Sequence, residues 1–165
     1  MSGERLDAGA LAERHYAEVL RLAWRLTGSR EAGEDIAQEV FLHLHRRAIV
    51  LDAEGHPLAY LRQMTARRAW KWMRERAPET ALPELEPAAP DARTAELTDR
   101  DRQLQRVMAC VSKLPPKTRA VFLLKEVEQL ETAEVAKMLG MLQVTVRRHA
   151  QIAREKLREM LGEAP

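Results

Sequence analysis

Residues 114–161 read LPPKTRAVFLLKEVEQLETAEVAKMLGMLQVTVRRHAQIAREKLREML, a pattern typical of one helix followed by a compact helix-turn-helix. Apolar residues recur at spacings that let two short helices pack across a tight bend: Val135, Leu139, Met141 and Val146. Gly140 lies where the chain must turn between the two helices. Glycine suits this position because it adopts left-handed backbone conformations without a steric penalty. Thr132 is the expected N-cap of the first short helix.

The helix predicted after the bend is strongly basic on its outer face. Its inner face consists of residues that recur every three or four positions: Val146, Ala150, Ala153 and Leu157. Residues 143–158 contain five Lys or Arg and one Glu, a net charge of +4. A helix with small or apolar residues inward and Arg or Gln outward suits the major groove of DNA. A solvated basic face is the alternative, but the helix-turn-helix spacing favours contact with DNA.

The composition predicts an all-α fold. The chain has 165 residues, of which 45% are hydrophobic and 32% charged, and no alternating run predicts a strand. The net charge is only +2, so binding to a polyanion must come from local patches. Cys110 is the single cysteine, which excludes an intramolecular disulfide. No signal peptide and no membrane-spanning apolar run is visible, so we expect a cytoplasmic protein without membrane insertion.

Residues 77–97 differ in composition from the rest of the chain. They contain four prolines, which break both helix and sheet: Pro78, Pro83, Pro87 and Pro90. Residues 77–101 contain seven Asp or Glu and two Arg, a net charge of −5. We interpret residues 77–97 as a flexible, Pro-rich, acidic linker. The linker predicts two small helical domains, residues 1–76 and residues 98–165.

Two helices are predicted in the first part of the chain. Residues 1–9 are expected to be a loose end, apart from Asp7, which caps a first helix that ends near Thr27. Gly28 and Ser29 then suit the end of that helix and the N-cap of the next. The second helix has a predicted core face with helical spacing: Ile36, Ala37, Val40, Phe41 and Leu44.

The second helix also collects acidic and polar side chains toward its N-terminal half: Glu34, Asp35, Gln38 and Glu39. Their position complements the helix dipole, so helix stabilisation accounts for them, and a face for a basic protein partner is the alternative. His43 and His45 raise the further alternative of a metal-dependent enzyme. That alternative is disfavoured because Glu39 and His43 are four residues apart, not three, and no second Glu–His pair exists. We expect no metal, no cofactor and no catalytic residue.

A third helix is predicted at residues 57–76, PLAYLRQMTARRAWKWMRER, because Pro57 suits a first helical turn after a loop at residues 48–55. Residues 56–76 contain six Lys or Arg and one Glu, a net charge of +5. Aromatic residues lie among these charges: Tyr60, Trp70 and Trp72. Basic residues attract phosphate and aromatic rings stack on exposed bases, which favours nucleic acid. The alternative is that Tyr60 and Trp72 lie in the core and the charges are solvated.

The second domain is expected to begin with a capping-box-like pair, Thr98 and Asp101. The helix that follows has a predicted core face: Leu104, Val107, Met108 and Val111. Cys110 lies beside this face and is expected to be a small buried residue.

Two blocks of the sequence, in this order, resemble a bacterial RNA polymerase sigma factor of the extracytoplasmic-function (ECF) group of the sigma-70 family. RLTGSREAGEDIAQEVFLHL looks like the family's region 2, and LPPKTRAVFLLKEVEQL with AEVAKMLG and VTVRRHAQIAREKL looks like its region 4. The resemblance covers residues 11–76 and 99–161. It implies a promoter-specificity factor, which binds core RNA polymerase and promoter DNA and is not itself an enzyme.

The resemblance also implies roles for particular residues. A face of the second helix would dock on the clamp helices of the largest polymerase subunit: Glu34, Asp35, Gln38 and Glu39. The third helix would bind and open the minus-10 promoter element: Arg62, Arg67, Arg68, Trp70, Lys71 and Arg74. The last helix would read the minus-35 element: Gln143, Thr145, Arg147, Arg148 and Gln151. An anti-sigma factor is a further partner expected from the family.

The chain departs from the family pattern at several positions. In the third helix, Tyr60 stands where Trp is frequent, Arg67 where Asn is frequent and Lys71 where Asp is frequent. Gln129 replaces a common Gly, and Leu142 replaces a common Ser that would cap the last helix. The changes in the third helix leave one alternative function open, a stand-alone helix-turn-helix regulator that does not melt promoters.

Overall fold

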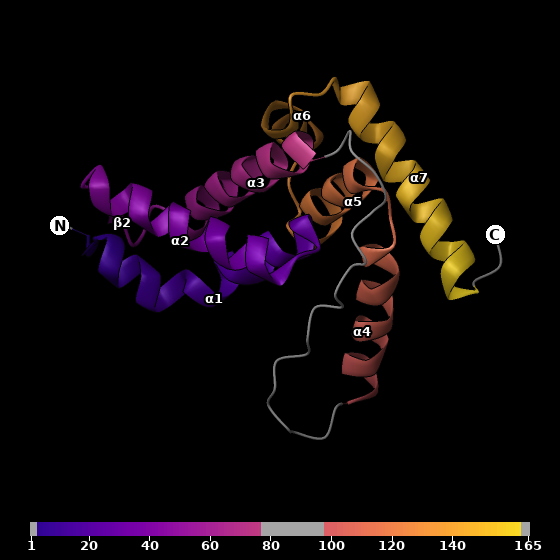
Figure 1. Cartoon of the computed structure of the whole chain (residues 1–165), viewed down its shortest axis with the longest axis horizontal. Coiled ribbons are helices and arrows are strands. Elements are labelled where there is room, and N and C mark those ends of the chain that lie inside the picture. Colours follow the sequence, from indigo (N-terminus) through magenta and orange to yellow (C-terminus); the bar gives the residue numbers. More distant parts are fainter. Residues whose placement is uncertain (1–2, 77–97, 163–165) are drawn as a thin grey trace. The chain divides into compact units, whose positions relative to one another are not determined.

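The computed structural model describes residues 3–76 and 98–162 (Figure 1). The chain divides into two compact units, residues 1–80 and residues 81–165, which we call the N-terminal and the C-terminal unit. Both units are built from helices, as the composition predicts, and the N-terminal unit adds one short two-stranded ribbon. The predicted linker, residues 77–97, lies outside the described residues.

The N-terminal unit consists of three helices that pack against one another: α1 (Ala8–Thr27), α2 (Arg30–Arg46) and α3 (Pro57–Arg76). Their inner faces form an aliphatic core: Leu11, Val19, Leu22, Leu26, Ile36, Ala37, Val40, Phe41, Leu44 and Leu61. The predicted core face of the second helix is therefore confirmed, and burial of these side chains is the main force that holds the unit together.

Local capping signals set the helix ends in the N-terminal unit. The Asp7 carboxylate accepts a hydrogen bond from the amide of Ala10 at 2.9 Å and starts α1. Gly28 ends α1 in the left-handed conformation (φ 70°), and the Ser29 side chain caps α2. All three predicted caps are confirmed, because each depends only on residues within one helical turn.

Helices α1 and α2 cross closely at Gly33. A Cβ atom at this position would lie 2.9 Å from the backbone nitrogen of Trp24 and 3.0 Å from its Cα. Glycine lowers helix propensity, so its presence inside α2 is explained by the space that it leaves for the α1 backbone.

A short antiparallel ribbon corrects two of the predictions. Strand β1 (Arg5–Leu6) pairs with β2 (Leu51–Asp52), and Leu6, which is only 2% exposed, lies opposite Leu51. The expected loose end at residues 1–9 and the expected loop at residues 48–55 therefore each contain a strand. Strands of two residues show no alternation, and their pairing joins distant parts of the chain, so a local pattern does not reveal them.

The C-terminal unit contains α4 (Asp99–Ser112), α5 (Pro116–Phe122), the π-helical turn η1 (Leu123–Val127), α6 (Thr132–Leu139) and α7 (Gln143–Leu161). Helix α7 packs on α4, α5 and α6. The core of the C-terminal unit is smaller than that of the N-terminal unit and is made mostly of aliphatic residues: Val111, Leu114, Val121, Leu123, Leu124, Val135, Leu139, Val146 and Leu157.

The predicted core face of α4 is only partly correct. Thr98 and Asp101 form the expected capping box, and Cys110 and Val111 are buried. Val107 and Met108 are half-buried, but Leu104 is 57% exposed. Figure 1 shows the start of α4 reaching beyond the other helices of its unit, so the apolar spacing continues past the point where partners are present.

The helix-turn-helix bend forms at Gly140, which has the left-handed conformation that was predicted (φ 62°). The N-cap of α6 is Glu131 and not Thr132, and the Glu131 amide donates to the Glu134 carboxylate at 3.0 Å. The Thr132 hydroxyl instead accepts a hydrogen bond from Lys125 at 3.0 Å. A lysine of η1, a few residues earlier in the chain, therefore engages the side chain that was expected to cap the helix.

Candidate functional site

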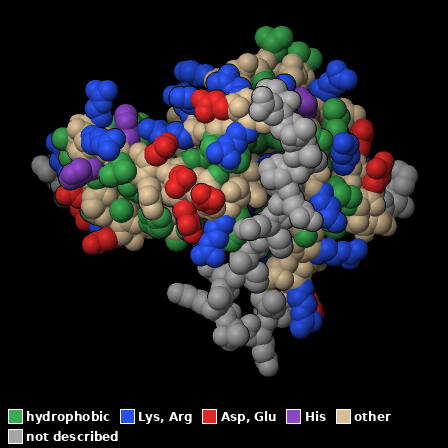
Figure 2. Space-filling model, in the orientation of Figure 1, with side chains coloured by type: hydrophobic (Ala, Val, Ile, Leu, Met, Phe, Trp, Pro, Cys, Tyr) green, Lys and Arg blue, Asp and Glu red, His purple; other side chains and the backbone are tan. Residues whose placement is uncertain are grey.

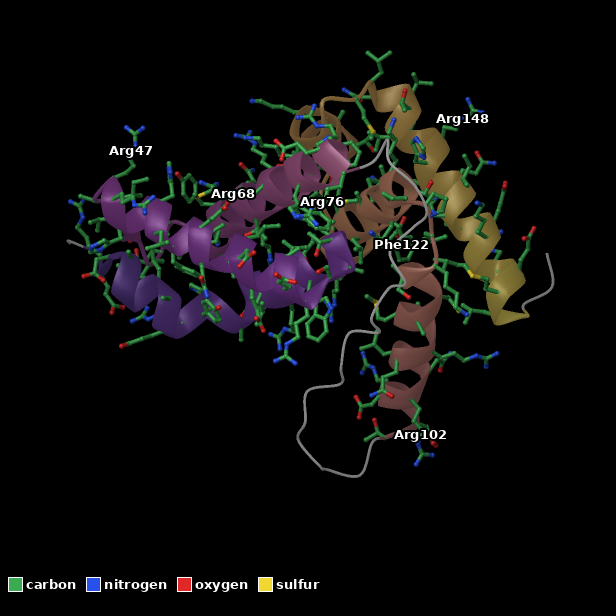
Figure 3. The ribbon with its side chains drawn as sticks, viewed as in Figure 1. Arg47, Arg68, Arg76, Arg102, Phe122 and Arg148 are labelled. Carbon is green, nitrogen blue, oxygen red and sulfur yellow. The ribbon has the colours of Figure 1, made fainter. Side chains whose placement is uncertain are left out.

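Helix α7 has the two-sided construction that its sequence predicts. Its inner face is buried and includes the small residues Ala150 and Ala153, which let the helix approach its neighbours. The outer face carries exposed polar and basic side chains: Gln143, Arg147, Arg148, Gln151 and Arg154. Thr145 is half-buried. Figure 3 shows Arg148 pointing away from the ribbon of α7, where a ligand has access to its guanidinium group.

The contacts along α7 show which basic side chains hold the helix in place and which are available to bind a ligand. Arg154 donates to the Glu126 carboxylate of η1 at 2.6 Å, so this pair holds α7 on the turn before the helix-turn-helix. Arg147 reaches the side-chain oxygen of Gln143 at 3.5 Å, one turn earlier on the same helix. A contact of this length between exposed groups is weak, and it leaves the Arg147 guanidinium able to bind a ligand.

The first turn of α7 is exposed and apolar. Leu142 occupies the N-cap position and provides no side-chain hydrogen bond, as expected from its chemistry. Leu142 is 72% exposed and Val144 is 65% exposed. This turn contains no acidic residue, so the positive end of the helix dipole is not neutralised there.

His149 fixes the position of α7 on α5. Its Nδ1 atom lies 3.1 Å from the hydroxyl oxygen of Thr118, which is buried. Burial lowers the pKa of His149, and the positive charges of Lys117 and Arg148 lower it further. The ring is therefore neutral near pH 7 and acts as a structural contact between α7 and α5.

Arg119 supports the C-terminal unit from inside and is a residue that sequence reasoning missed. It is 3% exposed, donates to the carbonyl of Ser112 at 3.3 Å, and burial lowers its pKa to about 10. Its position in the chain gave no signal, because LPPKTRAVF reads equally well with this arginine on the surface.

The predicted DNA-binding residues of α3 differ in their exposure to solvent. Arg67, Lys71 and Arg74 are exposed, and Arg62 and Arg68 are half-buried. Lys71 lies 3.9 Å from the carboxylate of the neighbouring Glu75, and Arg62 lies 3.7 Å from that of Glu18 on α1. Figure 3 labels Arg68 and Arg76 on this helix.

The aromatic residues of α3 do not share one environment. Trp70 is only 6% exposed, which contradicts its predicted place in the DNA-binding surface, because the ring offers almost no face to a base. Trp72 is half-buried, and the guanidinium of Arg76 lies 4.4 Å from its ring centroid. Tyr60 is exposed. Positions 70 and 72 point in different directions on a helix. The alternative that placed Tyr60 and Trp72 in the core is therefore wrong for Tyr60, and the ring that is buried most deeply is that of Trp70.

A hollow of about 480 Å³ lies where β1, α1, the β2–α3 loop and the start of α3 meet. Apolar and basic residues both line it, among them Leu6, Arg14, His15, His56, Pro57 and Arg62. His56 has a left-handed backbone (φ 54°) directly before α3. Apart from Arg62, which was predicted to contact DNA, sequence reasoning did not find the members of this hollow, because they come from separate segments of the chain.

The predicted polar face of α2 is present as a surface. Asp35, Gln38 and Glu39 are exposed, whereas Glu34 is half-buried and accepts a hydrogen bond from Arg30 at 2.9 Å. Figure 2 shows a group of Asp and Glu side chains together on the N-terminal unit. One turn further along α2, the exposed Leu42 borders a second hollow of about 430 Å³, which Gln38 also lines.

The histidines that suggested an enzyme, His43 and His45, both lie on α2. His43 is half-buried and His45 is exposed on α2. Within residues 3–76 and 98–162, no three His, Cys, Asp or Glu side chains are grouped so that they could hold a metal ion. No helix in the same residues is long and apolar enough to cross a membrane.

Comparisons with known proteins match both units. The family described as Sigma-70 region 2 matches residues 11–79, and the family described as Sigma-70, region 4, matches residues 104–157. The RNA polymerase sigma-E factor of Streptomyces coelicolor is 30% identical over 160 residues, which are 96% of this chain and 88% of that protein. The ECF RNA polymerase sigma factor SigE of Mycolicibacterium smegmatis is 30% identical over 156 residues, which are 92% of this chain.

The relatives differ in length. The chain spans 60% of the Mycolicibacterium protein and 37% of the probable RNA polymerase sigma factor RfaY of Xanthomonas campestris. Among solved structures, the fold is similar to that of the sigma factor RpoE from Bartonella quintana, solved in complex with the anti-sigma factor NepR. The TM-score is 0.65 at 16% identity, over 93% of this chain and 96% of that one. The chain therefore belongs to the sigma-70 family of RNA polymerase sigma factors, in its extracytoplasmic-function group.

Proposed function

We propose that this protein is a promoter-specificity factor, which binds core RNA polymerase and directs it to particular promoters in the cytoplasm. The observation that carries the proposal is the presence of region 2 and region 4 in one chain, each with an exposed surface suited to its task. Region 2 includes the basic helix α3 and the polar face of α2, and region 4 includes the recognition helix α7.

Helix α7 is proposed to enter the major groove at the minus-35 element. Arg147, Arg148 and Gln151 are exposed on its outer face and carry the donors and acceptors that read base edges. Gln143, which Arg147 contacts, and the half-buried Thr145 lie at the start of the helix and complete the proposed surface. The buried inner face holds the helix rigidly while this surface makes contact.

Helix α3 is proposed to bind and open the minus-10 element. Arg67, Lys71 and Arg74 are exposed and suit phosphate contacts, with the half-buried Arg62 and Arg68 beside them. Melting also needs a place for an unstacked base, and the hollow of about 480 Å³ next to α3 has a size typical of small-ligand sites. Trp70 is left out of this surface because it is buried.

The face of α2 that carries Asp35, Gln38 and Glu39 is proposed to dock on the clamp helices of the largest polymerase subunit. Exposed Leu42 lies one turn further on and adds an apolar contact to a polar face, a combination typical of protein interfaces. Glu34, which Arg30 engages, supports this face from its edge. An anti-sigma factor remains a partner expected from the family.

The test is transcription by a reconstituted holoenzyme. Core RNA polymerase and the full chain are combined and supplied with genomic DNA fragments, and abortive and run-off products are sequenced. Specific start sites that depend on this chain are the expected result. Tight, specific duplex binding by the free chain, with no transcription in the presence of core polymerase, contradicts the proposal and indicates a stand-alone regulator.

A further inference from the structure

Two exposed apolar side chains stand at the tip of the recognition helix. Leu142 and Val144 are among the most exposed large apolar residues in the described part of the chain, at 72% and 65%. Neither side chain belongs to the buried inner face of α7, which is formed by other residues: Val146, Ala150, Ala153 and Leu157. Both side chains are therefore available for contact with a partner outside the unit.

We propose that Val144 and Leu142 contact thymine C5-methyl groups in the major groove and so help to choose the minus-35 sequence. This inference rests on the proposed function and adds specificity-determining residues to it. In helix-turn-helix proteins, the N-terminal residues of the recognition helix contact base edges. The thymine methyl is the one apolar group that a base pair presents in that groove, so apolar side chains can recognise it.

The charges around the pair suit a negatively charged partner such as DNA and not a neutral or basic protein groove. The first turn of α7 has no acidic residue, and its backbone amides form the positive end of the helix dipole. Arg147 and Arg148 follow within one turn and are exposed, and Lys137 is exposed near the end of α6. An apolar tip framed by cations fits a groove whose walls are phosphates and whose floor includes methyl groups.

The residue types also determine what the pair can read. Leu142 and Val144 have no hydrogen-bonding atom in their side chains, so they discriminate only by the presence or absence of the methyl group. Gln143 between them supplies the amide that can bond to a base edge. The structure thus predicts at least one T·A pair in the minus-35 element whose recognition depends on the methyl and not on a hydrogen bond.

The test uses holoenzyme made from the full chain and core polymerase. The preferred minus-35 sequence is selected from randomised duplexes, and each thymine is then replaced singly by deoxyuridine, which removes only the methyl group. For at least one position, the deoxyuridine duplex should bind about three- to tenfold more weakly, which is the effect of one buried methyl group. The Val144→Ala or Leu142→Ala variant should bind the thymine duplex with a similar loss and no longer distinguish the two duplexes.

Met160→Ala provides the matched control, because Met160 is an exposed apolar residue in the last turn of α7. This variant should keep the full sensitivity to deoxyuridine. The inference is overturned if no thymine position responds, if the selected element contains no thymine, or if both tip variants keep the wild-type discrimination. Failure of the holoenzyme to select any sequence or start transcription instead overturns the proposed function itself.

Discussion

Helices α3 and α7 are both basic and both proposed to bind DNA, yet they are built in different ways. Eight of the 20 residues of α3 are buried, including bulky Met64, Trp70 and Met73, whereas four of the 19 residues of α7 are buried, two of them alanines. Helix α7 presents a reading surface that is separate from its core. Helix α3 is a central structural element of its own unit, so changes there affect folding and DNA contact together.

The largest expected effect comes from the core side of α3. Leu61→Ala should lower the free energy of unfolding of the N-terminal unit by about 2–5 kcal/mol, because Leu61 is fully buried and its loss leaves a cavity. All three tryptophans, Trp24, Trp70 and Trp72, lie in this unit, so tryptophan fluorescence during denaturation reports on it selectively.

Tyr60→Ala is the control for that comparison, because Tyr60 is adjacent to Leu61 but exposed. Its unfolding free energy should stay within about 0.5 kcal/mol of the wild type. Equal stability of the Leu61→Ala variant and the wild type would contradict the view of α3 as a core helix.

The crossing of α1 and α2 gives the next effect. Gly33→Ala should destabilise the N-terminal unit by about 1–3 kcal/mol, because the new Cβ meets the Trp24 backbone, which has no rotamer with which to move away. Gly9→Ala, at an exposed position of α1, should instead leave stability unchanged or raise it by up to about 1 kcal/mol. The same fluorescence measurement distinguishes the two, and a neutral Gly33→Ala would show that the helices can separate at little cost.

The outer face of α7 should respond in binding and not in stability. Arg147→Ala or Arg148→Ala should weaken binding of the holoenzyme to its minus-35 element by about 1–3 kcal/mol if the lost contact is to a base. Thermal unfolding should be unchanged, because both side chains are exposed. Lys156→Ala removes an exposed cation further along the same helix and should have a smaller effect on binding. Loss of stability in the arginine variants would erase the contrast between α7 and α3.

The smallest effect is expected at Gln129, between η1 and α6. Gln129 has a left-handed backbone (φ 55°), a conformation that glycine adopts without strain. Gln129→Gly should therefore stabilise the C-terminal unit by about 0.5–1 kcal/mol, after the greater flexibility of glycine in the unfolded chain is taken into account. The helical circular dichroism signal during heating, compared with the tryptophan signal of the other unit, reports the change. A lower unfolding temperature of the C-terminal unit in the Gln129→Gly variant would contradict backbone strain at this position.

Local signals predicted most of the helix boundaries, and non-local contacts explain the errors. Asp7, Gly28, Ser29 and Gly140 act within one turn of their own position, so the order of residues is sufficient to find them. Thr132 was predicted to be the N-cap of α6, but Glu131 is the N-cap. The Thr132 hydroxyl instead accepts a hydrogen bond from Lys125 of η1. The ribbon between β1 and β2 likewise depends on two segments that are far apart in sequence.

In the candidate site, too, the sequence predicted some features correctly and missed others. The outward direction of Arg147 and Arg148 follows from the regular spacing of the buried residues of α7, and it was predicted correctly. Helix α3 has so wide a buried face that the spacing of apolar residues does not separate core from surface. Trp70 was therefore predicted to lie on the DNA-binding surface, but it is buried. The apolar tip at Val144 was overlooked because exposure of an apolar residue is visible only in the folded unit.

Binding to core RNA polymerase tests the central claim most directly. The wild-type chain, an Asp35→Ala, Gln38→Ala double variant and a Glu13→Ala control, which removes an exposed carboxylate on α1, are each mixed with core polymerase and separated by size. The account predicts that the wild type and the control co-elute with polymerase and that the double variant does so much less, with all three chains equally folded. Absence of co-elution for a folded wild-type chain, or equal co-elution of the double variant, would contradict it.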